Sequence, residues 1–283
     1  MHFPLAFLSP LLATVVLAAP APERINLNKR DVTPVSTGQL SSYSPFTQFA
    51  RAAYCEPGKV EGWQCGEACS ALPGFQPTLT GGDGNSVQYF FVGYWPEQNT
   101  VVVAHQGTDP TELYVPSVVH EGFADQHAQT AGQILGEVRN LMDQHNTNSI
   151  TLIGHSLGGA LAELDSLYMR LNIPNASVKG VTYGTPRVGN DDFASYFDGQ
   201  VSDFTRITNR DDLIPIVPGR FLGFAHPHGE IHIIDDGDAV ACSGSDNEDD
   251  QCITGQVGNI FEGNIIDHLG PYEGIYIGTL FCN

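Results

Sequence analysis

The chain has 283 residues and a formal net charge of −20, because 32 Asp and Glu side chains outnumber 12 Lys and Arg. This charge repels nucleic acid and anionic membrane surfaces, and it is compatible with uncharged substrates. The length is sufficient for one large hydrophobic core or two small ones. No internal repeat or low-complexity linker divides the sequence, so we predict one domain.

The first thirty residues are typical of targeting and processing segments. An apolar run over 1–19 ends in two small residues, as a secretory signal peptide does, and it is too short and too interrupted by prolines to span a membrane. A dibasic pair at 29–30 predicts removal of a pro-segment over 20–30. We therefore expect a secreted, extracellular domain over 31–283 without a transmembrane segment.

Six cysteines in a chain predicted to be secreted indicate three disulfides, since an oxidising compartment favours disulfides over metal binding. Close spacing favours two local pairs, and the two remaining cysteines would tie the ends of the domain together. The predicted pairs are Cys65–Cys69, Cys242–Cys252 and Cys55–Cys282. One N-glycosylation sequon begins at Asn175.

Hydrophobic periodicity predicts strands that alternate with helices. A helix at 45–54 begins with a proline, and a disulfide-pinned loop at 55–71 precedes two strands joined by a turn, at 88–94 and 100–104. The remaining expected elements are a long amphipathic helix at 122–145, strands at 150–153, 178–183, 204–208 and 230–234, and a short helix at 191–197. Such alternation is typical of an α/β fold with a mostly parallel sheet and helices on both faces.

The sequence Gly154-His155-Ser156-Leu157-Gly158 lies between a short apolar strand and a helix-forming run. Glycines on both sides allow neighbouring backbone to pass close to a sharp turn, which presents the Ser156 hydroxyl above the N-terminus of the next helix. The N–H groups at that helix end can stabilise developing negative charge. This arrangement predicts a nucleophilic serine.

A nucleophilic serine needs a base within hydrogen-bond reach, and the base needs an acid that orients it. In this class of fold both partners follow the serine in chain order, each on a loop after a later strand. Asp211 and Asp212 directly follow the strand at 204–208, and either could be the acid. Three histidines within 226–232 could also hold a metal ion, but strand alternation would scatter them over both faces. The candidate bases are His226, His228, His232 and His268.

The oxyanion of an acyl-transfer intermediate needs two hydrogen-bond donors. The N–H of Leu157, the residue after the nucleophile, is one candidate. The second should come from the loop after an early strand, where Gly107 and Thr108 follow the strand at 100–104. The hydroxyl of Thr108 could donate as well.

Several motifs, taken together and in order, resemble the fungal class 3 lipases, which are secreted triacylglycerol lipases of filamentous fungi. The resemblance covers residues 42–282. Residues 105–108, His-Gln-Gly-Thr, are similar to an oxyanion loop in which an aromatic residue and an arginine usually precede the glycine. Further matches are Ala53-Tyr54-Cys55, Val119 to Phe123, Gly154 to Gly159, Tyr183 to Gly189, Asp212-Leu213-Ile214-Pro215, and Asp267-His268-Leu269 with Tyr272.

This resemblance implies an α/β-hydrolase fold and an ester hydrolase that works through an acyl-enzyme without metal or cofactor. It selects the second of the two adjacent aspartates. Ser156 would be the nucleophile, His268 the general base and then acid, and Asp212 the residue that orients His268. Thr108 and Leu157 would form the oxyanion hole.

The main departure from the family is the stretch at 109–118, which stands where a lid helix and a further connection are expected. It is short and holds two prolines, so we predict a shortened lid region. The favoured function is hydrolysis of acylglycerols at an oil–water interface by a monomer. The alternatives are a soluble-ester or feruloyl-type esterase, which suits a short lid, and a catalytically silent lipase-like protein, which the missing segment suggests. The acidic loop at 246–250 is expected to be solvated rather than to bind Ca²⁺.

Overall fold

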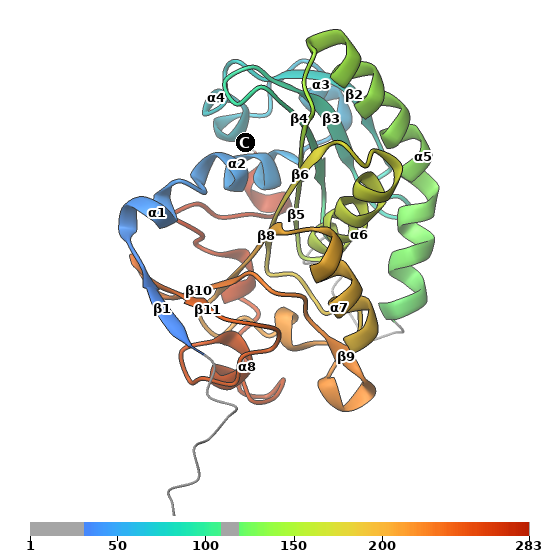
Figure 1. Ribbon diagram of the computed structural model, residues 1–283. Helices are drawn as coiled ribbons and strands as arrows, with labels where there is room; N and C mark the ends of the chain where they lie inside the picture. Colours follow the sequence, from blue (N-terminus) through green and yellow to red (C-terminus); the bar gives the residue numbers. More distant parts are fainter. Residues whose placement is uncertain (1–30, 109–118, 283) are drawn as a thin grey trace, which may run out of the picture.

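A nine-stranded β-sheet forms the centre of the protein, with helices packed on both faces (Figure 1). The computed structural model describes residues 31–108 and 119–282. In chain order the strands of this sheet are β1 (Val32–Val35), β2 (Gln76–Gly81), β3 (Phe90–Trp95), β4 (Thr100–His105), β5 (Ser149–His155), β6 (Ser177–Tyr183), β8 (Asp203–Asn209), β10 (Glu230–Asp235) and β11 (Asp238–Cys242). Across the sheet their order is β1-β11-β10-β8-β6-β5-β4-β3-β2.

The helices lie mainly between the strands in sequence. They are α1 (Thr37–Ser41), α2 (Ser44–Ala52), α3 (Pro57–Glu61), α4 (Glu67–Ser70), α5 (Val119–His145), α6 (Leu157–Asn172), α7 (Asp191–Gln200) and α8 (Ile253–Gln256), with the 3-10 turns η1 (Ile214–Ile216), η2 (Arg220–Leu222), η3 (Asp267–Leu269) and η4 (Thr279–Phe281). A separate two-stranded ribbon pairs β7 (Gly189–Asn190) with β9 (Phe224–Ala225). In the part of the chain that the structure covers, no helix combines the length and apolar character that a bilayer crossing requires.

The five central strands β4, β5, β6, β8 and β10 run parallel, and the outer pairings are antiparallel. The carboxyl ends of the parallel strands therefore meet at one edge of the sheet, where open α/β sheets place their ligand sites. The loops after β4, β5, β6 and β8 carry Gly107, Ser156, Gly184 and Asp212 to this edge. The predicted α/β architecture, with a mostly parallel central sheet and helices on both faces, is confirmed.

The face of the sheet that packs against α5 and α6 carries two rows of different character. Val103, Leu152 and Phe204 belong to an apolar layer on this face. Nearer the carboxyl edge, strand register aligns a mostly polar row, because neighbours in register point to the same side. Its members are His105, Gly154, Thr182, Arg206 and Glu230. The opposite face, against α2, is mainly apolar.

Three strands that the sequence did not predict complete the sheet, namely β1, β2 and β11. The first two are the edge strands, and each contains a proline, which edge strands tolerate and which hides the strand pattern. The loop predicted at 55–71 contains α3 and α4, and α5 begins slightly before its predicted start at 122. The predicted shortened lid region at 109–118 and the predicted leader segments over 1–30 lie outside the described residues.

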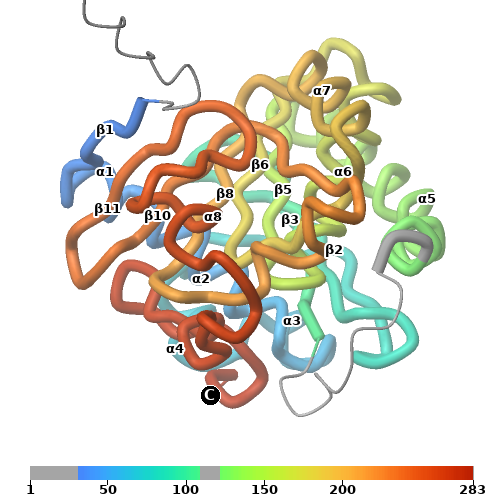
Figure 2. Tube along the Cα trace, turned by 90° about the horizontal axis from the view of Figure 1, so that it is seen from below, coloured from blue at the N-terminus to red at the C-terminus, as the bar shows by residue number. Residues whose placement is uncertain are grey.

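The structure contains the three predicted disulfides. Cys55–Cys282 joins residues 227 positions apart, whereas Cys65–Cys69 and Cys242–Cys252 close local loops. A cross-link between distant residues restricts the unfolded chain more than a local one, so the first disulfide is expected to stabilise the domain most. Figure 2, viewed from below, shows that the C-terminus lies near α4, away from the start of β1.

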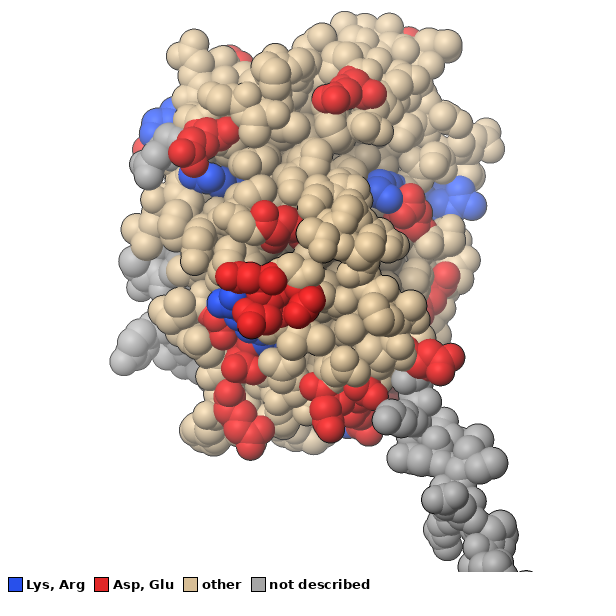
Figure 3. Space-filling view, turned by 90° about the vertical axis from the view of Figure 1, so that its left-hand side faces the viewer, with Lys and Arg blue, Asp and Glu red and all other residues tan. Residues whose placement is uncertain are grey.

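Surface charge is uneven. On the side of the molecule that carries β1 and β11, acidic side chains gather in the lower half of the view and basic side chains are few (Figure 3). Basic residues often lie beside acidic ones, as Arg210 does with Asp235, 3.2 Å away. A surface of this kind does not attract polyanions.

Candidate active site

Ser156 lies at the sharp turn between the last residue of β5 and the first residue of α6. Its backbone has φ 60° and ψ −130°, a left-handed conformation that is strained for a residue with a side chain. Its N–H donates to the carbonyl of Tyr183 at 2.9 Å, which ties the turn to the end of β6. A strained serine at a strand–helix junction has the geometry of a nucleophile elbow.

Gly154 and Gly158 leave the space through which this turn passes. A Cβ on Gly154 would lie 1.9 Å from the carbonyl oxygen of Gly158, and a Cβ on Gly158 would lie 2.2 Å from the carbonyl oxygen of His105. Both distances are far inside van der Waals contact, so no larger residue fits at either position. The two glycines therefore allow α6 to approach β4 and β5 closely.

Asp212 and His268 form a buried pair at the same edge of the sheet. His268 Nδ1 lies 2.8 Å from Asp212 Oδ2, and the N–H of Ile214 donates to Asp212 Oδ1 at 2.9 Å. Because the carboxylate accepts, His268 donates through Nδ1 and keeps Nε2 unprotonated, the tautomer that a general base needs. No described residue forms a hydrogen bond to this Nε2.

The two adjacent aspartates point in different directions. The side-chain amide of Gln256 donates to Asp211 Oδ1 at 2.8 Å, and the N–H of Asn264 donates to the carbonyl of Asp211 at 2.6 Å. Asp211 is therefore held toward α8, and Asp212 is the one that reaches His268. The predicted catalytic roles stay predictions, but only the second aspartate has the required contact.

Gly184, at the end of β6, makes room for this pair. A Cβ at this position would lie 2.8 Å from both Asp212 Oδ2 and His268 Nδ1, and the backbone has φ +52°. A side chain would therefore displace one member of the pair and also strain the backbone. In the sequence this glycine is part of the motif from Tyr183 to Gly189, which does not indicate the contact.

Two side chains, one distant in the sequence and one near, hold the backbone at His268. Its carbonyl accepts from His155 Nε2 at 2.7 Å and from the hydroxyl of Tyr272 at 3.2 Å. Since His155 donates through Nε2, its Nδ1 accepts from the hydroxyl of Tyr54, 2.6 Å away. Burial, and after it the positive charge that His268 carries when protonated, lowers the pKa of His155 well below its ordinary value, so this ring is neutral. The sequence placed these supporting residues in motifs without indicating their role.

Gly107 lies against the nucleophile turn. A Cβ on Gly107 would lie 2.7 Å from Ser156 Cβ and 2.5 Å from the carbonyl oxygen of His155. Leu157 begins α6, where the first N–H groups have no partner within the helix. The two predicted oxyanion donors, Thr108 and Leu157, therefore lie on segments that both adjoin Ser156.

The other candidate histidines are used in separate places. His226 donates to a backbone carbonyl, His228 pairs with a carboxylate of α7, and His232 lies between a threonine hydroxyl of β8 and a glutamine of α8. One group with metal-ligand spacing is found among the residues described, and it consists of Glu230 and both sulfurs of a disulfide. Disulfide sulfurs provide no thiolate, so this group is not a typical metal site.

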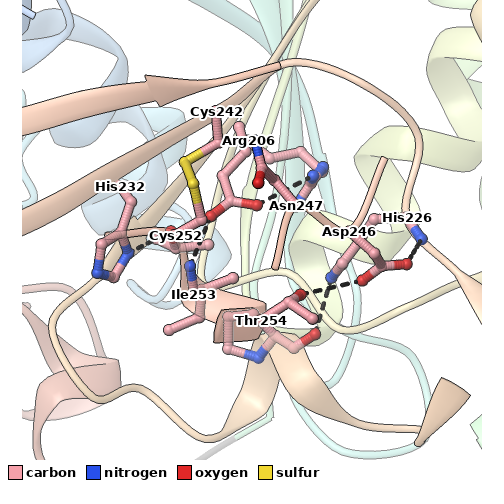
Figure 4. A network of polar contacts seen from close by, with 12 residues as sticks. Arg206, His226, His232, Cys242, Asp246, Asn247, Cys252, Ile253 and Thr254 are labelled. Atoms are coloured by element: carbon pink, nitrogen blue, oxygen red, sulfur yellow. Dashed lines mark hydrogen bonds and ion pairs between the residues drawn. A yellow bond between two sulfur atoms is a disulfide. The ribbon is translucent and has the colours of Figure 1, made fainter. Parts of the chain in front are cut away.

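The expectation of a solvated loop at 246–250 is wrong for its first residue. Asp246 is buried, and its carboxylate accepts from the Arg187 guanidinium at 2.7 Å and from the N–H of His226 at 3.0 Å (Figure 4). Burial acts to raise the pKa of Asp246, but His226 and Arg187 outweigh it and hold this pKa well below its ordinary value. Arg187 also donates to the carbonyl of Pro218 at 3.0 Å, which ties the acidic loop to the segment after Asp212. Both oxygens of Asp246 are thus already used by donors.

Residues 96–222 match the family model described as Lipase (class 3). A lipase from Rhizopus niveus is 27% identical over 262 residues, which cover 86% of this chain and 66% of that protein. A secreted mono- and diacylglycerol lipase from Malassezia globosa is 29% identical over 218 residues, which cover 69% of each protein. The chain thus spans about two thirds of the length of these relatives.

Solved structures show the same architecture. Lipase II from Rhizopus niveus superposes with a TM-score of 0.79 at 27% identity, over 89% of this chain and 100% of that one. The Rhizomucor miehei triacylglyceride lipase superposes with a TM-score of 0.77 at 24% identity, over 89% of this chain and 100% of that one. These similarities confirm the predicted α/β-hydrolase fold.

Proposed function

We propose that the chain is a serine hydrolase of the class 3 lipase family that cleaves the carboxylic esters of acylglycerols, as its similarity to these lipases supports. The observation that carries the proposal is the buried pair of Asp212 and His268. The Nε2 atom of His268 has no hydrogen-bond partner among the described residues. The His268 ring lies 4.4 Å, centroid to centroid, from the ring of His155, the residue before Ser156. An oriented base beside a strained serine is the arrangement that activates a hydroxyl for attack.

In the proposed reaction, His268 Nε2 takes the proton of the Ser156 hydroxyl as Oγ attacks the ester carbonyl. The oxyanion of the tetrahedral intermediate accepts hydrogen bonds from Leu157 and Thr108. His268 then gives its proton to the leaving alcohol, and the acyl group remains on Ser156. Water, deprotonated by His268, attacks the acyl-enzyme, and His268 returns this proton to Ser156 Oγ as the carboxylic acid leaves. Asp212 holds the imidazole in the correct tautomer and stabilises its protonated form.

Exposed apolar side chains in the segments that connect Asp212 to His268 favour a lipid substrate over a soluble ester. Ten large hydrophobic side chains are exposed in the described part of the chain, and six of them fall in the segments between Asp212 and His268. These six, which we call the apolar rim, are Phe221, Leu222, Ile260, Phe261, Ile265 and Ile266. A Cβ on Gly263 would lie 2.5 Å from Leu213 Cβ, so the second segment packs beside the acid loop. Exposed apolar groups in number mark surfaces that bind apolar partners.

We also propose that the protein is secreted. Three disulfides require an oxidising compartment, and several relatives are named secreted lipases. The acidic surface suits an uncharged lipid better than an anionic membrane. The same proposal includes a signal peptide over 1–19, a pro-segment over 20–30 and a single domain over 31–283. It also includes glycosylation at Asn175 and a monomeric state.

The proposal is tested by the initial rate of hydrolysis of a short-chain triacylglycerol, measured through its solubility limit with Ser156→Ala as the blank. We expect the variant to lose at least about 10³-fold in rate, because it lacks the nucleophile. A jump in the wild-type rate at the solubility limit is expected if the apolar rim engages the lipid surface. Saturation below the limit without a jump would indicate an esterase for soluble substrates, and rates equal to the blank would indicate a silent protein.

The double variant Phe221→Ser/Phe261→Ser locates the lipid-binding surface. These side chains are 90% and 91% exposed, so their removal should leave the fold and the rate on a soluble ester unchanged while it removes the jump. Leu171→Ser, on α6 and 50% exposed, is the matched control and should keep the jump. A double variant that keeps the jump would show that the apolar rim does not bind the lipid.

A further inference from the structure

An aspartate of α6 joins two histidines in the interior of the protein. The Asp165 side chain is fully buried, Oδ2 accepts from His105 Nε2 at 2.6 Å, and Oδ1 accepts from His127 Nε2 at 2.8 Å. His105 is the last residue of β4, and His127 lies on α5. We call these three residues the His–Asp–His cluster. The reaction proposed above uses none of them.

Both imidazoles donate to an ionised Asp165. Burial is the strongest influence and acts to raise the pKa of this carboxyl, but hydrogen bonds from His105 and His127 outweigh burial and lower the pKa. An ionised carboxylate only accepts, so each Nε2 carries a proton. Hydrogen bonds to a charged group are the stronger class, and here they are shielded from water. The cluster therefore fixes the relative positions of β4, α5 and α6.

The oxyanion loop starts directly after this cluster. Gln106 follows His105, and its N–H donates to the carbonyl of Tyr89 at 2.8 Å while its side chain accepts from the N–H of Tyr89 at 2.9 Å. A Cβ on the next residue, Gly107, would lie 2.3 Å from the hydroxyl of Tyr54. The loop thus has little freedom of its own, and its position depends on where β4 ends.

The two predicted oxyanion donors lie on the two elements that the cluster joins. Leu157 begins α6, and Thr108 follows β4. Among the hydrogen bonds of the residues described, the contact between His105 and Asp165 is the only side-chain bond from β4 to α6. Asp165 lies eight residues after Leu157, about 12 Å along the helix, so it fixes the helix well beyond its first turn.

We propose that the His–Asp–His cluster is a positioning device that sets the separation of the two oxyanion donors, which makes His105, Asp165 and His127 positioning residues for ester hydrolysis. This inference rests on the proposed function. Oxyanion donors act at about 2.7–3.1 Å from the charge that forms, so a small shift of β4 against α6 weakens one of them. By the resemblance to class 3 lipases an aromatic residue usually stands at 105, and this chain has His105 there.

The test compares two replacements of His127, whose side chain is 14% exposed and tolerates change better than the other two. His127→Gln keeps an amide N–H near the position of Nε2 and can donate to Asp165, whereas His127→Met has similar length and no donor. For each variant we would measure kcat and KM on a soluble short-chain ester, the inhibition constant of an alkyl boronic acid, and urea unfolding. Rates are normalised to the fraction of protein that an alkyl phosphonate labels. His145→Met, at the other end of α5, is the control.

We expect His127→Met to lower kcat about tenfold and to weaken boronic acid binding by a similar factor, with KM within about twofold, because only the tetrahedral state uses the oxyanion donors. His127→Gln should recover most of both losses, and His145→Met should match the wild type. If His127→Met does not fold, the double variant His105→Phe/Asp165→Leu replaces the polar contact with an apolar one and serves the same comparison.

Two results would overturn the inference while the proposed function stands. One is an active wild type whose kcat and boronic acid affinity are unchanged in His127→Met. The other is a variant with lower stability but an unchanged rate per labelled molecule, which would give the cluster a purely structural role. A wild type no more active than Ser156→Ala would instead overturn the proposed function, and the inference with it.

Discussion

The polar row on the α5 and α6 side of the sheet has two ends that differ in how completely they are hydrogen-bonded. At the β4 end, the His–Asp–His cluster pairs its carboxylate with two N–H donors at 2.6 and 2.8 Å. At the β8 and β10 end, Arg206 Nη2 lies 3.6 Å from Glu230 Oε2, and neither Nη atom has a hydrogen-bond partner among the described residues (Figure 4). At the first end the charged groups hydrogen-bond to one another. At the second end each bonds to backbone instead: Arg206 Nε donates to the carbonyl of Pro227 at 3.1 Å, and Glu230 Oε1 accepts from the N–H of Ile253 at 2.8 Å. The contact between Arg206 and Glu230 is therefore mainly one of charge.

Glu163, also on α6, adds to this difference. It is fully buried, and neither of its carboxylate oxygens has a hydrogen-bond partner in the part of the chain described. Burial raises its pKa to about 8, against the opposing charge of Arg206. Helix α6, which begins next to Ser156, is thus held by hydrogen bonds at Asp165, whereas the charge of Glu163 on the same helix changes with pH. The comparison predicts that substitutions at the arginine end act on stability.

The largest effect is expected from Arg206→Met, which leaves Glu230 buried without its cation. We expect the free energy of unfolding near neutral pH to fall by about 3–5 kcal/mol, measured by urea unfolding. Lys179→Met is the matched control, because its pair with Asp203 also joins two neighbouring parallel strands, β6 and β8, at 2.9 Å but is partly exposed, and it should cost about 0.5 kcal/mol or less. A loss in Arg206→Met no larger than in the control would contradict the account.

The next effect depends on pH. The ordinary pKa of Glu163 is 4.5, and its folded value is about 8. The folded state therefore keeps a proton that the unfolded state releases, so stability is fully present below about pH 4.5 and declines until about pH 8. Glu163→Gln imitates the neutral acid. It should therefore remove this decline in the free energy of unfolding, which is up to about 1.4 kcal/mol per pH unit in that range. Parallel stability curves for wild type and variant between about pH 5 and 9 would refute this assignment.

The smallest effect concerns a buried hydroxyl in the same row. Thr182 Oγ1 has no hydrogen-bond partner among the residues that the structure describes, so Thr182→Val should change the free energy of unfolding by only about 0.5 kcal/mol. Thr208→Val on the neighbouring strand is the control, since the hydroxyl of Thr208 donates to His232 Nδ1 at 2.8 Å, and it should lose about 1 kcal/mol. Equal losses in the two variants would show that Thr182 has a polar contact that the structure does not contain.

Local patterns in the sequence were sufficient for the parts of the fold that depend on near neighbours. The strand, turn and helix around Ser156 follow from apolar periodicity and glycine spacing. Edge strands β1 and β2 were missed because each contains a proline. The choice of Asp212 over its neighbour came from a family resemblance, since either aspartate satisfied the spacing argument.

Contacts between distant residues could not be predicted in this way. Asp246 was expected in solvent because it opens an acidic run, and its partner Arg187 lies 59 positions away in sequence. Asp165 likewise meets His105 and His127 from 60 and 38 positions away. No local signal marks a buried charge whose partners come from other elements, because burial depends on how the elements pack. The role of Gly184 was hidden for the same reason.

The central claim is that Ser156 is a nucleophile activated by His268, and covalent labelling tests it most directly. Folded protein would be incubated with an alkyl phosphonate, and the modified peptide would be identified by mass spectrometry. We expect one adduct, on Ser156 in the wild type, no adduct in Ser156→Ala, and labelling slower by at least about 10³-fold in His268→Ala. A folded wild type without an adduct, or with an adduct on another residue, would contradict the account.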